Sequence, residues 1–343
     1  MTCLGHPGLR SRAAAIVHGL LRPELPRSGS GAGLVVGHRG AARDQPENTI
    51  PSFRRALTLG ADAIETDVSA TSDGRFALWH DRDPDDRVAL ARQLGAERLA
   101  YRPDAPPAGS PWRRPVSELS SEQLRGHYAY ARNRLARRPA PGPERAAIAF
   151  LEDLLGWAPT AAGLREVFLD VKLSETETTA TAALARVVRA AADAASRIRF
   201  HLLSPRAEIV AALVAETTAA PSAFVRVSAD FELPGAGEIA PRTRADEVSL
   251  GHGGRFWAGF RWDVAKALQA REKGLVASVF VWTINDRARL ARLYRNGVDG
   301  VLTDEPELAR SLAGPAREEV RSRAPRPKAS GLSARRVAIR GPA

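Results

Sequence analysis

Short apolar runs alternate with longer amphipathic stretches along most of the chain. Eight runs have the length and composition of buried strands, at residues 34–37, 63–68, 167–173, 198–203, 224–228, 247–250, 279–284 and 300–302. Apolar residues recur at helical spacing between most of these runs, at residues 49–59, 147–155, 178–195, 205–215, 261–273 and 286–296. Because alternating strands and helices form parallel sheets with right-handed crossovers, the fold class is α/β. Eight strands favour a closed (β/α)8 barrel, and a doubly wound open sheet is the alternative.

The two ends of the chain differ in composition from the part between them. Of the formal net charge of +11 over 343 residues, residues 317–343 carry +6 and residues 1–30 carry +3. We therefore expect a flexible leader over residues 1–30, a barrel domain over residues 31–316, and a basic, disordered tail over residues 317–343. Neither tail holds an aromatic residue for base stacking, which argues against specific nucleic-acid binding. The basic tail still suits a weak contact with a polyanion or a membrane surface.

Other broad classes are excluded by what the composition lacks. No stretch approaches the roughly 18 consecutive apolar residues of a membrane-spanning helix. The single cysteine, Cys3, excludes a disulfide framework and a cysteine-based zinc site. Residues 1–30 show no clear signal-peptide pattern, so we expect a cytoplasmic protein.

Three carboxylates lie near the ends of predicted strands. Glu65 and Asp67 are two residues apart, so a strand places both on one face, and Asp170 and Lys172 share a face of the following strand. Unpaired carboxylates that point into a barrel mouth are very costly, and a hard divalent cation, Mg²⁺ or Ca²⁺, would offset their charge. The alternative is a buried salt-bridge network in which Lys172 and Arg39 pair with the carboxylates.

Two histidines are placed to accompany this acidic group. His38 follows the first predicted strand, in a Gly-His-Arg-Gly turn that lets the backbone approach a ligand closely. Residues 71–74 read Thr-Ser-Asp-Gly, a turn signal that predicts a hairpin returning His80 to the end of the second strand. Two histidines beside a metal suit proton transfer, because imidazole titrates near neutral pH. Among the other histidines, only His252, at the end of the sixth run, is a candidate for the mouth.

Ordered motifs occur at both ends of the predicted barrel. The first part reads Gly-His-Arg-Gly at 37–40, Pro-Glu-Asn-Thr at 46–49, Glu-Thr-Asp-Val at 65–68 and His-Asp at 80–81. The last part reads Val-Trp-Thr-Ile-Asn at 281–285 and Gly-Val-Asp-Gly-Val-Leu-Thr-Asp-Glu-Pro at 297–306. Across residues 34–310 the chain thereby resembles the glycerophosphodiester phosphodiesterase family. The resemblance implies a TIM barrel with an insertion after the second strand, here about residues 82–145.

The resemblance also implies a reaction and a role for each matching residue. The reaction is hydrolysis of a small or lipid-derived glycerophosphodiester to glycerol 3-phosphate and an alcohol, with water or the neighbouring glycerol hydroxyl as nucleophile. The implied site consists of His38 and His80 as the acid–base pair, Glu65, Asp67 and Asp170 as ligands of one divalent cation, Arg39 and Lys172 as phosphate-binding residues, and Trp282 at the mouth. Trp282 equally fits a core aromatic at a strand end. Glu47 and Asn48 are expected to brace the first loop.

Departures from the family pattern leave alternatives open. Asp170 stands where the family usually has a glutamate, and the residues after His80 and Asp81 do not continue the usual motif. Asp-x-Lys at 170–172 also resembles the sphingomyelinase D-like phospholipases, which makes a lipid phosphodiesterase an alternative, as is an inactive barrel that only binds phosphate esters. The insertion is expected to set substrate choice. Its aromatics, such as Trp112 and Tyr128, would either cover a head group or form a small core of their own.

Overall fold

Eight parallel strands form a closed barrel in the computed structural model, which describes residues 33–138, 142–195, 197–231, 244–252 and 257–323 and side chains as far as residue 314. The strands are β1 (Leu34–Gly37), β2 (Ala63–Ala70), β7 (Glu166–Val171), β8 (Arg199–Ser204), β9 (Val225–Phe231), β10 (Glu247–Gly251), β11 (Ser278–Trp282) and β12 (Gly300–Thr303). The barrel closes because β1 pairs in parallel with both β12 and β2. All eight predicted strands are confirmed, and the open-sheet alternative is excluded.

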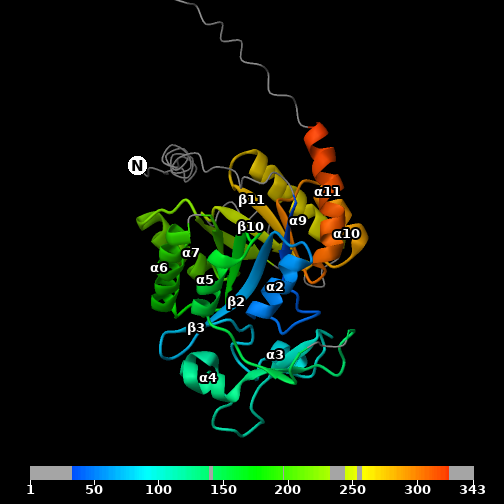
Figure 1. Cartoon of the computed structure of the whole chain (residues 1–343). Coiled ribbons are helices and arrows are strands. Elements are labelled where there is room, and N and C mark those ends of the chain that lie inside the picture. Colours follow the sequence, from blue (N-terminus) through cyan, green and yellow to red (C-terminus); the bar gives the residue numbers. More distant parts are fainter. Residues whose placement is uncertain (1–32, 139–141, 196, 232–243, 253–256, 324–343) are drawn as a thin grey trace, which may run out of the picture.

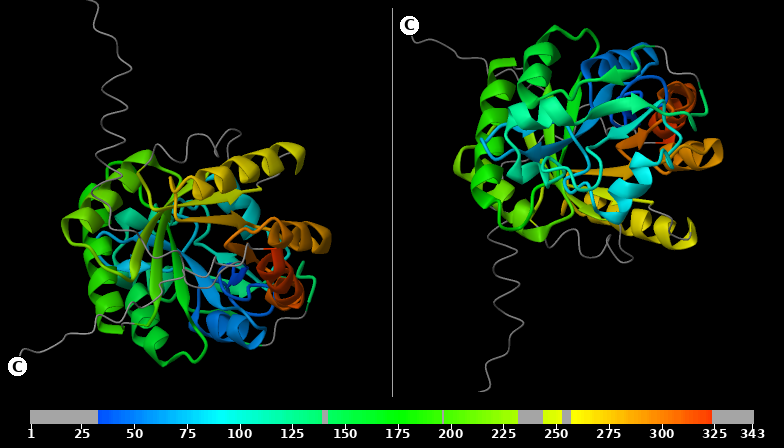
Figure 2. Two further views of the ribbon diagram at one scale, coloured as in Figure 1. Left: turned by 90° about the horizontal axis from the view of Figure 1, so that it is seen from above. Right: turned by 90° about the horizontal axis from the view of Figure 1, so that it is seen from below.

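Helices pack around the outside of this barrel (Figures 1 and 2). They are α2 (Ile50–Thr58), α5 (Leu151–Trp157) with the 3-10 turn η2 (Ala158–Thr160), α6 (Thr178–Ala195), α7 (Ala207–Ala219), α9 (Trp257–Glu272), α10 (Arg287–Arg295) and α11 (Pro306–Arg323). The main apolar core lies between the strands and these helices, and a smaller cluster fills the barrel interior, where the Phe168 and Phe280 rings lie 4.8 Å apart. The fold is therefore the expected (β/α)8 barrel.

Several helices differ from the prediction, and α9 begins at Trp257 rather than at residue 261. The helix expected from residue 147 begins at Leu151, because Ile148 and Phe150 are buried and Phe150 forms a β-bridge with Ala77. The helix α11 was not predicted, and its backbone runs through residues 317–323, which were expected in the disordered tail. Pro306 suits the first turn of that helix, and its Ala309 and Ala313 are buried. The expected leader and the rest of the tail lie outside the described residues.

The expected hairpin and insertion follow β2. Strand β3 (Phe76–Ala77) pairs antiparallel with the end of β2, through Ser69 opposite Ala77. The insertion contains α3 (Arg87–Gln93), β4 (Tyr101–Asp104), the 3-10 turn η1 (Val116–Glu118), α4 (Ser121–His127), β5 (Ala129–Arg132) and β6 (Arg145–Ala146). Strands β4, β5 and β6 form a separate antiparallel sheet. The insertion lies across the end of the barrel at which the strands finish (Figure 2, right).

The aromatic residues of the insertion form a core of their own. The ring of Trp79 lies 6.0 Å from that of Tyr128 and 4.9 Å from that of Tyr130, and all three side chains are buried. Trp112 packs against this cluster and stacks on His127 at 4.6 Å. The packing alternative is therefore correct for Tyr128, and neither Trp112 nor Tyr128 lines the cavity described below.

A second group of charged residues lies inside the barrel at its opposite end. We call Glu166, Arg199, His201 and Glu247 the floor cluster. Glu166 and Glu247 are the first residues of β7 and β10, and the two ring nitrogens of His201 lie 2.8 and 2.6 Å from their carboxylates. The His201 ring stacks on Phe168 with centroids 4.1 Å apart.

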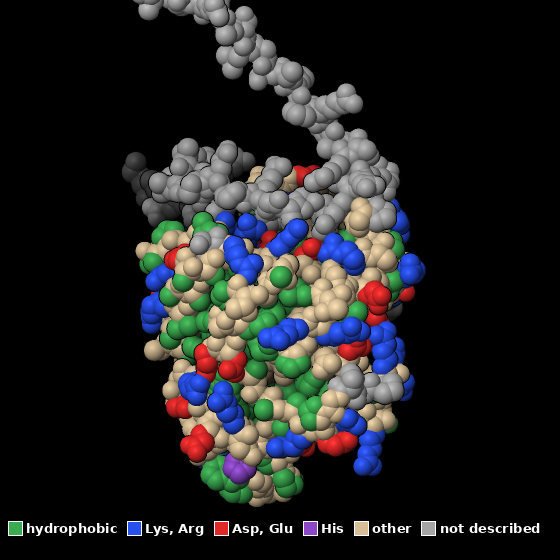
Figure 3. Space-filling view, viewed as in Figure 1, with side chains coloured by type: hydrophobic (Ala, Val, Ile, Leu, Met, Phe, Trp, Pro, Cys, Tyr) green, Lys and Arg blue, Asp and Glu red, His purple; other side chains and the backbone are tan. Residues whose placement is uncertain are grey.

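Neither a membrane-spanning helix nor, on the face drawn in Figure 3, a concentrated basic patch is found among the described residues. Among the described residues, no helix combines the length and apolarity required to cross a bilayer. On the face drawn in Figure 3, Lys and Arg side chains are dispersed over both barrel and insertion and intermingle with acidic ones.

Candidate active site

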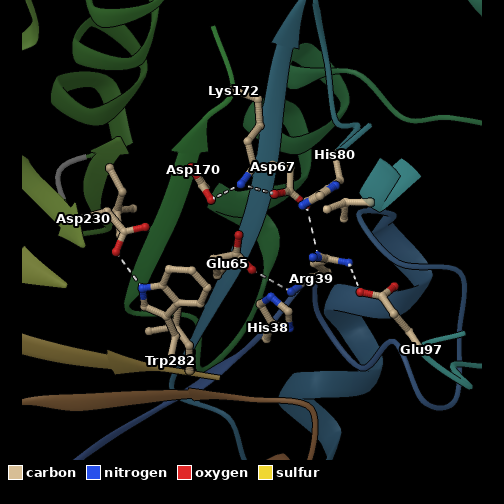
Figure 4. Close-up of a pocket in the computed structure, with 13 residues that line it drawn as sticks. His38, Arg39, Glu65, Asp67, His80, Glu97, Asp170, Lys172, Asp230 and Trp282 are labelled. Carbon is tan, nitrogen blue, oxygen red and sulfur yellow. Dashed lines mark hydrogen bonds and ion pairs between the residues drawn. The ribbon is translucent and has the colours of Figure 1, made fainter. Parts of the chain in front are cut away.

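A cavity of about 230 Å³ opens at the end of the barrel where the strands finish (Figure 4). This is the end at which (β/α)8 barrels carry their sites, because the loops that follow the strands meet there. All eight residues implied by the sequence line it, namely His38, Arg39, Glu65, Asp67, His80, Asp170, Lys172 and Trp282. The other lining residues are Val88, Glu97, Leu203, Asp230 and Leu302.

Three carboxylates converge in this cavity and are called the mouth cluster: Glu65, Asp67 and Asp170. One oxygen of each lies within 4.8 Å of the others. Glu65 and Asp67 share a face of β2, and Asp67 is directly opposite Asp170 in the parallel pairing of β2 with β7. Glu65 and Asp67 are buried and Asp170 is half-buried. The two-residue period of the strand thus positions the cluster as predicted.

The salt-bridge alternative is realised only in part. Lys172 Nζ lies 2.5 Å from Asp170 Oδ2 and 3.4 Å from Asp67 Oδ1, and Arg39 Nε lies 3.2 Å from Asp67 Oδ2. Among the described residues, however, no Lys or Arg side chain pairs with Glu65, whose Oε2 accepts only the backbone N–H of Arg39 at 2.8 Å. Asp170 Oδ1 is buried without a hydrogen-bond partner.

This remaining negative charge makes the mouth cluster suitable for a cation. Burial, with the neighbouring charge of Asp67, raises the pKa of Glu65 to about 7. Burial also raises the pKa of Asp170, despite the Lys172 ammonium. A hard divalent cation prefers carboxylate oxygens, and it would compensate both groups. The residues present therefore fit the metal that the resemblance implies.

Arg39 joins the first loop to the mouth. Its backbone is left-handed, with φ of 51°, a conformation that costs a non-glycine residue energy. Its Nη1 lies 3.0 Å from Glu47 and 3.4 Å from Glu97, and Arg92 pairs with the same two carboxylates. Asn48 donates to Asp67 Oδ2 at 2.9 Å. Glu47 and Asn48 thus brace the loop, as expected.

Trp282 connects the mouth to a fourth carboxylate. Its Nε1 donates to Asp230 Oδ1 at 2.6 Å, and Asp230 lies near the end of β9 (Figure 4). Burial, together with the nearby Asp170, raises the pKa of Asp230 to about 8. Trp282 lines the cavity and also packs against the apolar cluster in the barrel interior. It is therefore both a residue of the mouth and a core aromatic at a strand end.

The first histidine, His38, is paired with a carboxylate that stays ionised. Its Nδ1 lies 2.8 Å from Asp304 Oδ1, and Asn285 donates to Asp304 Oδ2 at 2.6 Å. Burial and Arg39 lower the pKa of His38, but Asp304 and Glu65 raise it by more, so the net shift is upward. Burial raises the pKa of Asp304, but His38 and Asn285 lower it by more, to about 2. The pair therefore favours a protonated imidazole.

The second histidine, His80, has a carboxylate partner, Asp81, that also pairs with an arginine. Its Nδ1 lies 2.6 Å from Asp81 Oδ1, which also accepts from Arg92 Nε at 2.8 Å. Burial and the positive charges of Arg39 and Arg92 lower the pKa of His80 well below its ordinary value, although Asp67 opposes them. His80 is therefore held neutral near pH 7, whereas His38 is not.

Sequence reasoning missed several residues that orient this site. Asp304 lies 266 positions from His38, and Asn285, which orients Asp304, belongs to the Val-Trp-Thr-Ile-Asn motif at residues 281–285. Asp230 has a signal in the sequence, since it follows Ser228 at strand spacing, and strand β9 extends beyond the predicted run at 224–228 to Phe231. His252 does not line the cavity, because its ring packs against Phe260.

The geometry agrees with what comparison with known proteins finds. The model of the glycerophosphoryl diester phosphodiesterase family matches residues 38–308. The chain belongs to this family. The matched region includes the eight cavity residues that the sequence implied and the two aspartates that contact the histidines. It also includes the entire insertion of this family member.

Curated relatives share short, similar segments with the chain. The glycerophosphodiester phosphodiesterase of Caldanaerobacter subterraneus is 52% identical over 52 residues, which are 15% of this chain and 21% of the relative. The Bacillus altitudinis protein of that name is 51% identical over 47 residues, 14% of this chain and 19% of the relative. The chain thus aligns with about a fifth of the length of these relatives.

Solved structures extend the likeness to the whole fold. A glycerophosphodiester phosphodiesterase from Agrobacterium tumefaciens is 20% identical with a TM-score of 0.55, covering 82% of this chain and 100% of that one. An Oleispira antarctica phosphodiesterase, solved in complex with its product sn-glycerol-3-phosphate, is 16% identical with a TM-score of 0.58, covering 82% and 96%. At such identities the likeness establishes the barrel fold.

Proposed function

We propose that this protein hydrolyses glycerophosphodiesters to glycerol 3-phosphate and an alcohol. One observation carries the proposal: two histidines with opposite pKa shifts face one cavity that also holds three carboxylates and the ammonium of Lys172. Such a pair of titratable groups is what acid–base catalysis requires. The product found with the Oleispira antarctica phosphodiesterase supports the same substrate class.

Binding of the phosphodiester depends on the positive groups of the cavity. Lys172 contacts Asp67 and Asp170 from the cavity side, so its ammonium is available to a phosphoryl oxygen. Arg39 is engaged with Glu47, Asp67 and Glu97, and its contribution is mainly the charge that it adds near the phosphate. A divalent cation held by the mouth cluster would supply Lewis-acid stabilisation of the phosphoryl charge.

The two histidines divide the proton transfers. His80, neutral near pH 7, accepts the proton of the attacking hydroxyl, which belongs to water or to the neighbouring glycerol carbon. As the new O–P bond forms and the bond to the alcohol breaks, His38 donates its proton to the leaving oxygen. Asp304 stabilises the charged form of His38, and Asp81 fixes the orientation of His80. When the glycerol hydroxyl attacks, the first product is a cyclic phosphate that water then opens.

A turnover assay with a range of substrates tests this proposal. Purified protein should release glycerol 3-phosphate from glycerophosphoglycerol, and a chelator should remove the activity, which added Mg²⁺ or Ca²⁺ restores. Full activity after complete chelation would exclude the cation. Binding of glycerophosphodiesters without turnover would instead favour the inactive barrel, and faster release of free choline from lysophospholipids would favour the sphingomyelinase D-like alternative.

The pH profile tests the assignment of the two histidines. Activity requires His80 unprotonated and His38 protonated, so kcat/KM should rise with pH through the pKa of His80, below 6.5, and fall through the pKa of His38, above 6.5. His80→Ala should remove the acidic limb and leave the alkaline one. The reverse result would exchange the two roles.

A further inference from the structure

A second cavity adjoins the first on the side of the insertion. It measures about 360 Å³ and shares His38, Arg39, Glu97 and Trp282 with the catalytic cavity. Its remaining walls include three further arginines, Arg43, Arg98 and Arg137, and these define what we call the arginine pocket. The shared wall places this pocket beside the imidazole of His38.

The arginine pocket has more positive than negative charge that is free to act on a ligand. Its two carboxylates are already engaged, since Glu97 pairs with Arg39 and Arg92, and Asp304 pairs with His38. Among the described residues, no acidic side chain pairs with Arg98 or Arg137. Both side chains are exposed, so they can turn toward a ligand without breaking an ion pair.

Arg43 adds a partly satisfied guanidinium. Its Nη1 lies 2.8 Å from Glu305 Oε1, but its Nε is buried without a hydrogen-bond partner. A buried donor of a charged group that lacks a partner is costly, and an anionic oxygen in the pocket would satisfy it. This donor and the unpaired charges of Arg98 and Arg137 point to the same kind of ligand.

The backbone holds the two exposed arginines on one wall. The N–H of Arg137 donates to the carbonyl of Arg98 at 3.3 Å, and Asn133 bonds to Gly95 and Ala100 on the same loop. Arg98 itself has a left-handed φ of 54°, which a non-glycine residue adopts only where the surroundings impose it. The two segments, whose arginines are 39 positions apart in the sequence, are thus fixed to each other rather than independently mobile.

We propose that the arginine pocket is a subsite for the alcohol portion of the substrate and that it selects alcohols bearing a second anionic group, such as a terminal phosphate. This inference rests on the proposed function, because the leaving oxygen must lie beside His38 and the alcohol must then extend past the shared wall. A planar guanidinium can donate two parallel hydrogen bonds to two oxygens of one phosphate. The same positive charge repels a choline or ethanolamine cation. The insertion therefore sets substrate choice through its arginines rather than through Trp112 or Tyr128.

Two diesters that differ by one phosphate provide the test. For the wild-type protein, kcat/KM should be about tenfold higher for glycerophosphoglycerol phosphate than for glycerophosphoglycerol, as expected for two charge-assisted contacts at a solvated site. The double variant Arg98→Gln and Arg137→Gln should abolish that preference and change kcat/KM for glycerophosphoglycerol, which lacks the terminal phosphate, less than about twofold. Arg134→Gln is the matched control, because Arg134 belongs to the same segment and shares a neighbouring cavity with Arg137, but does not line the arginine pocket.

A binding measurement separates this inference from the proposed function. Calorimetric titration of the His80→Ala protein, which leaves the lining of the arginine pocket intact, with each intact diester reports affinity without turnover. Tighter binding of the phosphorylated diester that disappears with the two arginine substitutions would support the subsite, even if the wild type hydrolysed neither compound and the proposed function failed. Equal affinity for both diesters, or equal losses on both after the substitutions, would overturn the subsite whatever the activity.

Discussion

The barrel buries one group of carboxylates at each end, and the two groups are balanced in different ways. In the floor cluster, His201 bridges Glu166 and Glu247, and Arg199 lies 3.0 Å from Glu166. In the mouth cluster, Lys172 and Arg39 reach only part of the acidic surface, and Glu65 has no Lys or Arg partner among the described residues.

The pKa values follow this difference in compensation. At the floor, burial lowers the pKa of His201, but Glu247 and Glu166 raise it by more, to about 9, so the imidazole stays charged. At the mouth, burial and Asp67 raise the pKa of Glu65 to about 7. A buried carboxylate therefore has a structural role where a cationic side chain of the protein compensates its charge. Where no such side chain is present, the buried carboxylate indicates a site for a ligand cation.

The largest expected effect separates chemistry from folding at the mouth. His38→Ala and His80→Ala should each lower kcat by roughly 10²–10⁴, because each removes a proton-transfer group. Both side chains face the cavity, so the thermal unfolding midpoint should stay within a few degrees of wild type. Steady-state kinetics and calorimetry of the same preparations measure the two quantities. A variant with near-normal turnover would remove that histidine from the mechanism.

The floor should show the opposite behaviour. His201→Gln leaves Glu247 buried without its cation and Glu166 with Arg199 alone, and it should reduce the free energy of unfolding by roughly 3–5 kcal/mol. Denaturant titration measures the loss, while turnover per folded molecule should stay near wild type. The double variant His201→Gln and Glu247→Gln removes one buried charge and should recover part of the stability. A loss of turnover without a loss of stability would contradict this structural role.

The pH dependence of stability provides a finer test of the floor cluster. Because the pKa of His201 is about 9 when folded and near its ordinary 6.5 when unfolded, its contribution is complete below pH 6.5 and is lost as the pH rises through 9. The loss amounts to about 3 kcal/mol over that window. Unfolding free energies measured from pH 6 to 10 should show this decline, and His201→Gln should flatten it.

Metal binding should stabilise the mouth and leave the floor unaffected. A cation at about 100 times its dissociation constant adds about 2.7 kcal/mol to the free energy of unfolding. The shift in melting temperature on adding Mg²⁺ or Ca²⁺ should vanish in Asp170→Asn, which removes a carboxylate of the mouth cluster. The shift should persist in His201→Gln, which destabilises the floor cluster and leaves the mouth cluster unchanged. A shift that survives Asp170→Asn would place the cation elsewhere.

The smallest effect is expected from removal of residues 324–343, which belong to neither cluster. Turnover of a small diester should be unchanged. Association with a polyanion such as heparin should weaken and lose salt dependence, since the segment carries five of the basic residues, Arg326, Lys328, Arg335, Arg336 and Arg340. A large fall in turnover would mean that this segment takes part in the site.

Much of the fold and part of the site were predictable because their signals are local. The eight strands were readable as short apolar runs between amphipathic segments. Glu65 and Asp67 followed from the two-residue period of a strand, and the hairpin that returns His80 followed from the turn at residues 71–74. The family motifs added the expected roles. The helix α11 lacks such a clear local signal, because its last turns are rich in charged residues like the basic tail that follows.

The remaining assignments depend on contacts between distant parts of the chain. The pKa shift of His38 comes from Asp304, 266 positions away, and that of His201 from residues 35 and 46 positions away. Likewise, Arg98 and Arg137 form one wall only because two loops of the insertion are hydrogen-bonded to each other. Residue types and strand periodicity establish which groups carry charge and on which strands they lie. Which of those charges are compensated depends on burial and on partners that are brought together only in the folded barrel.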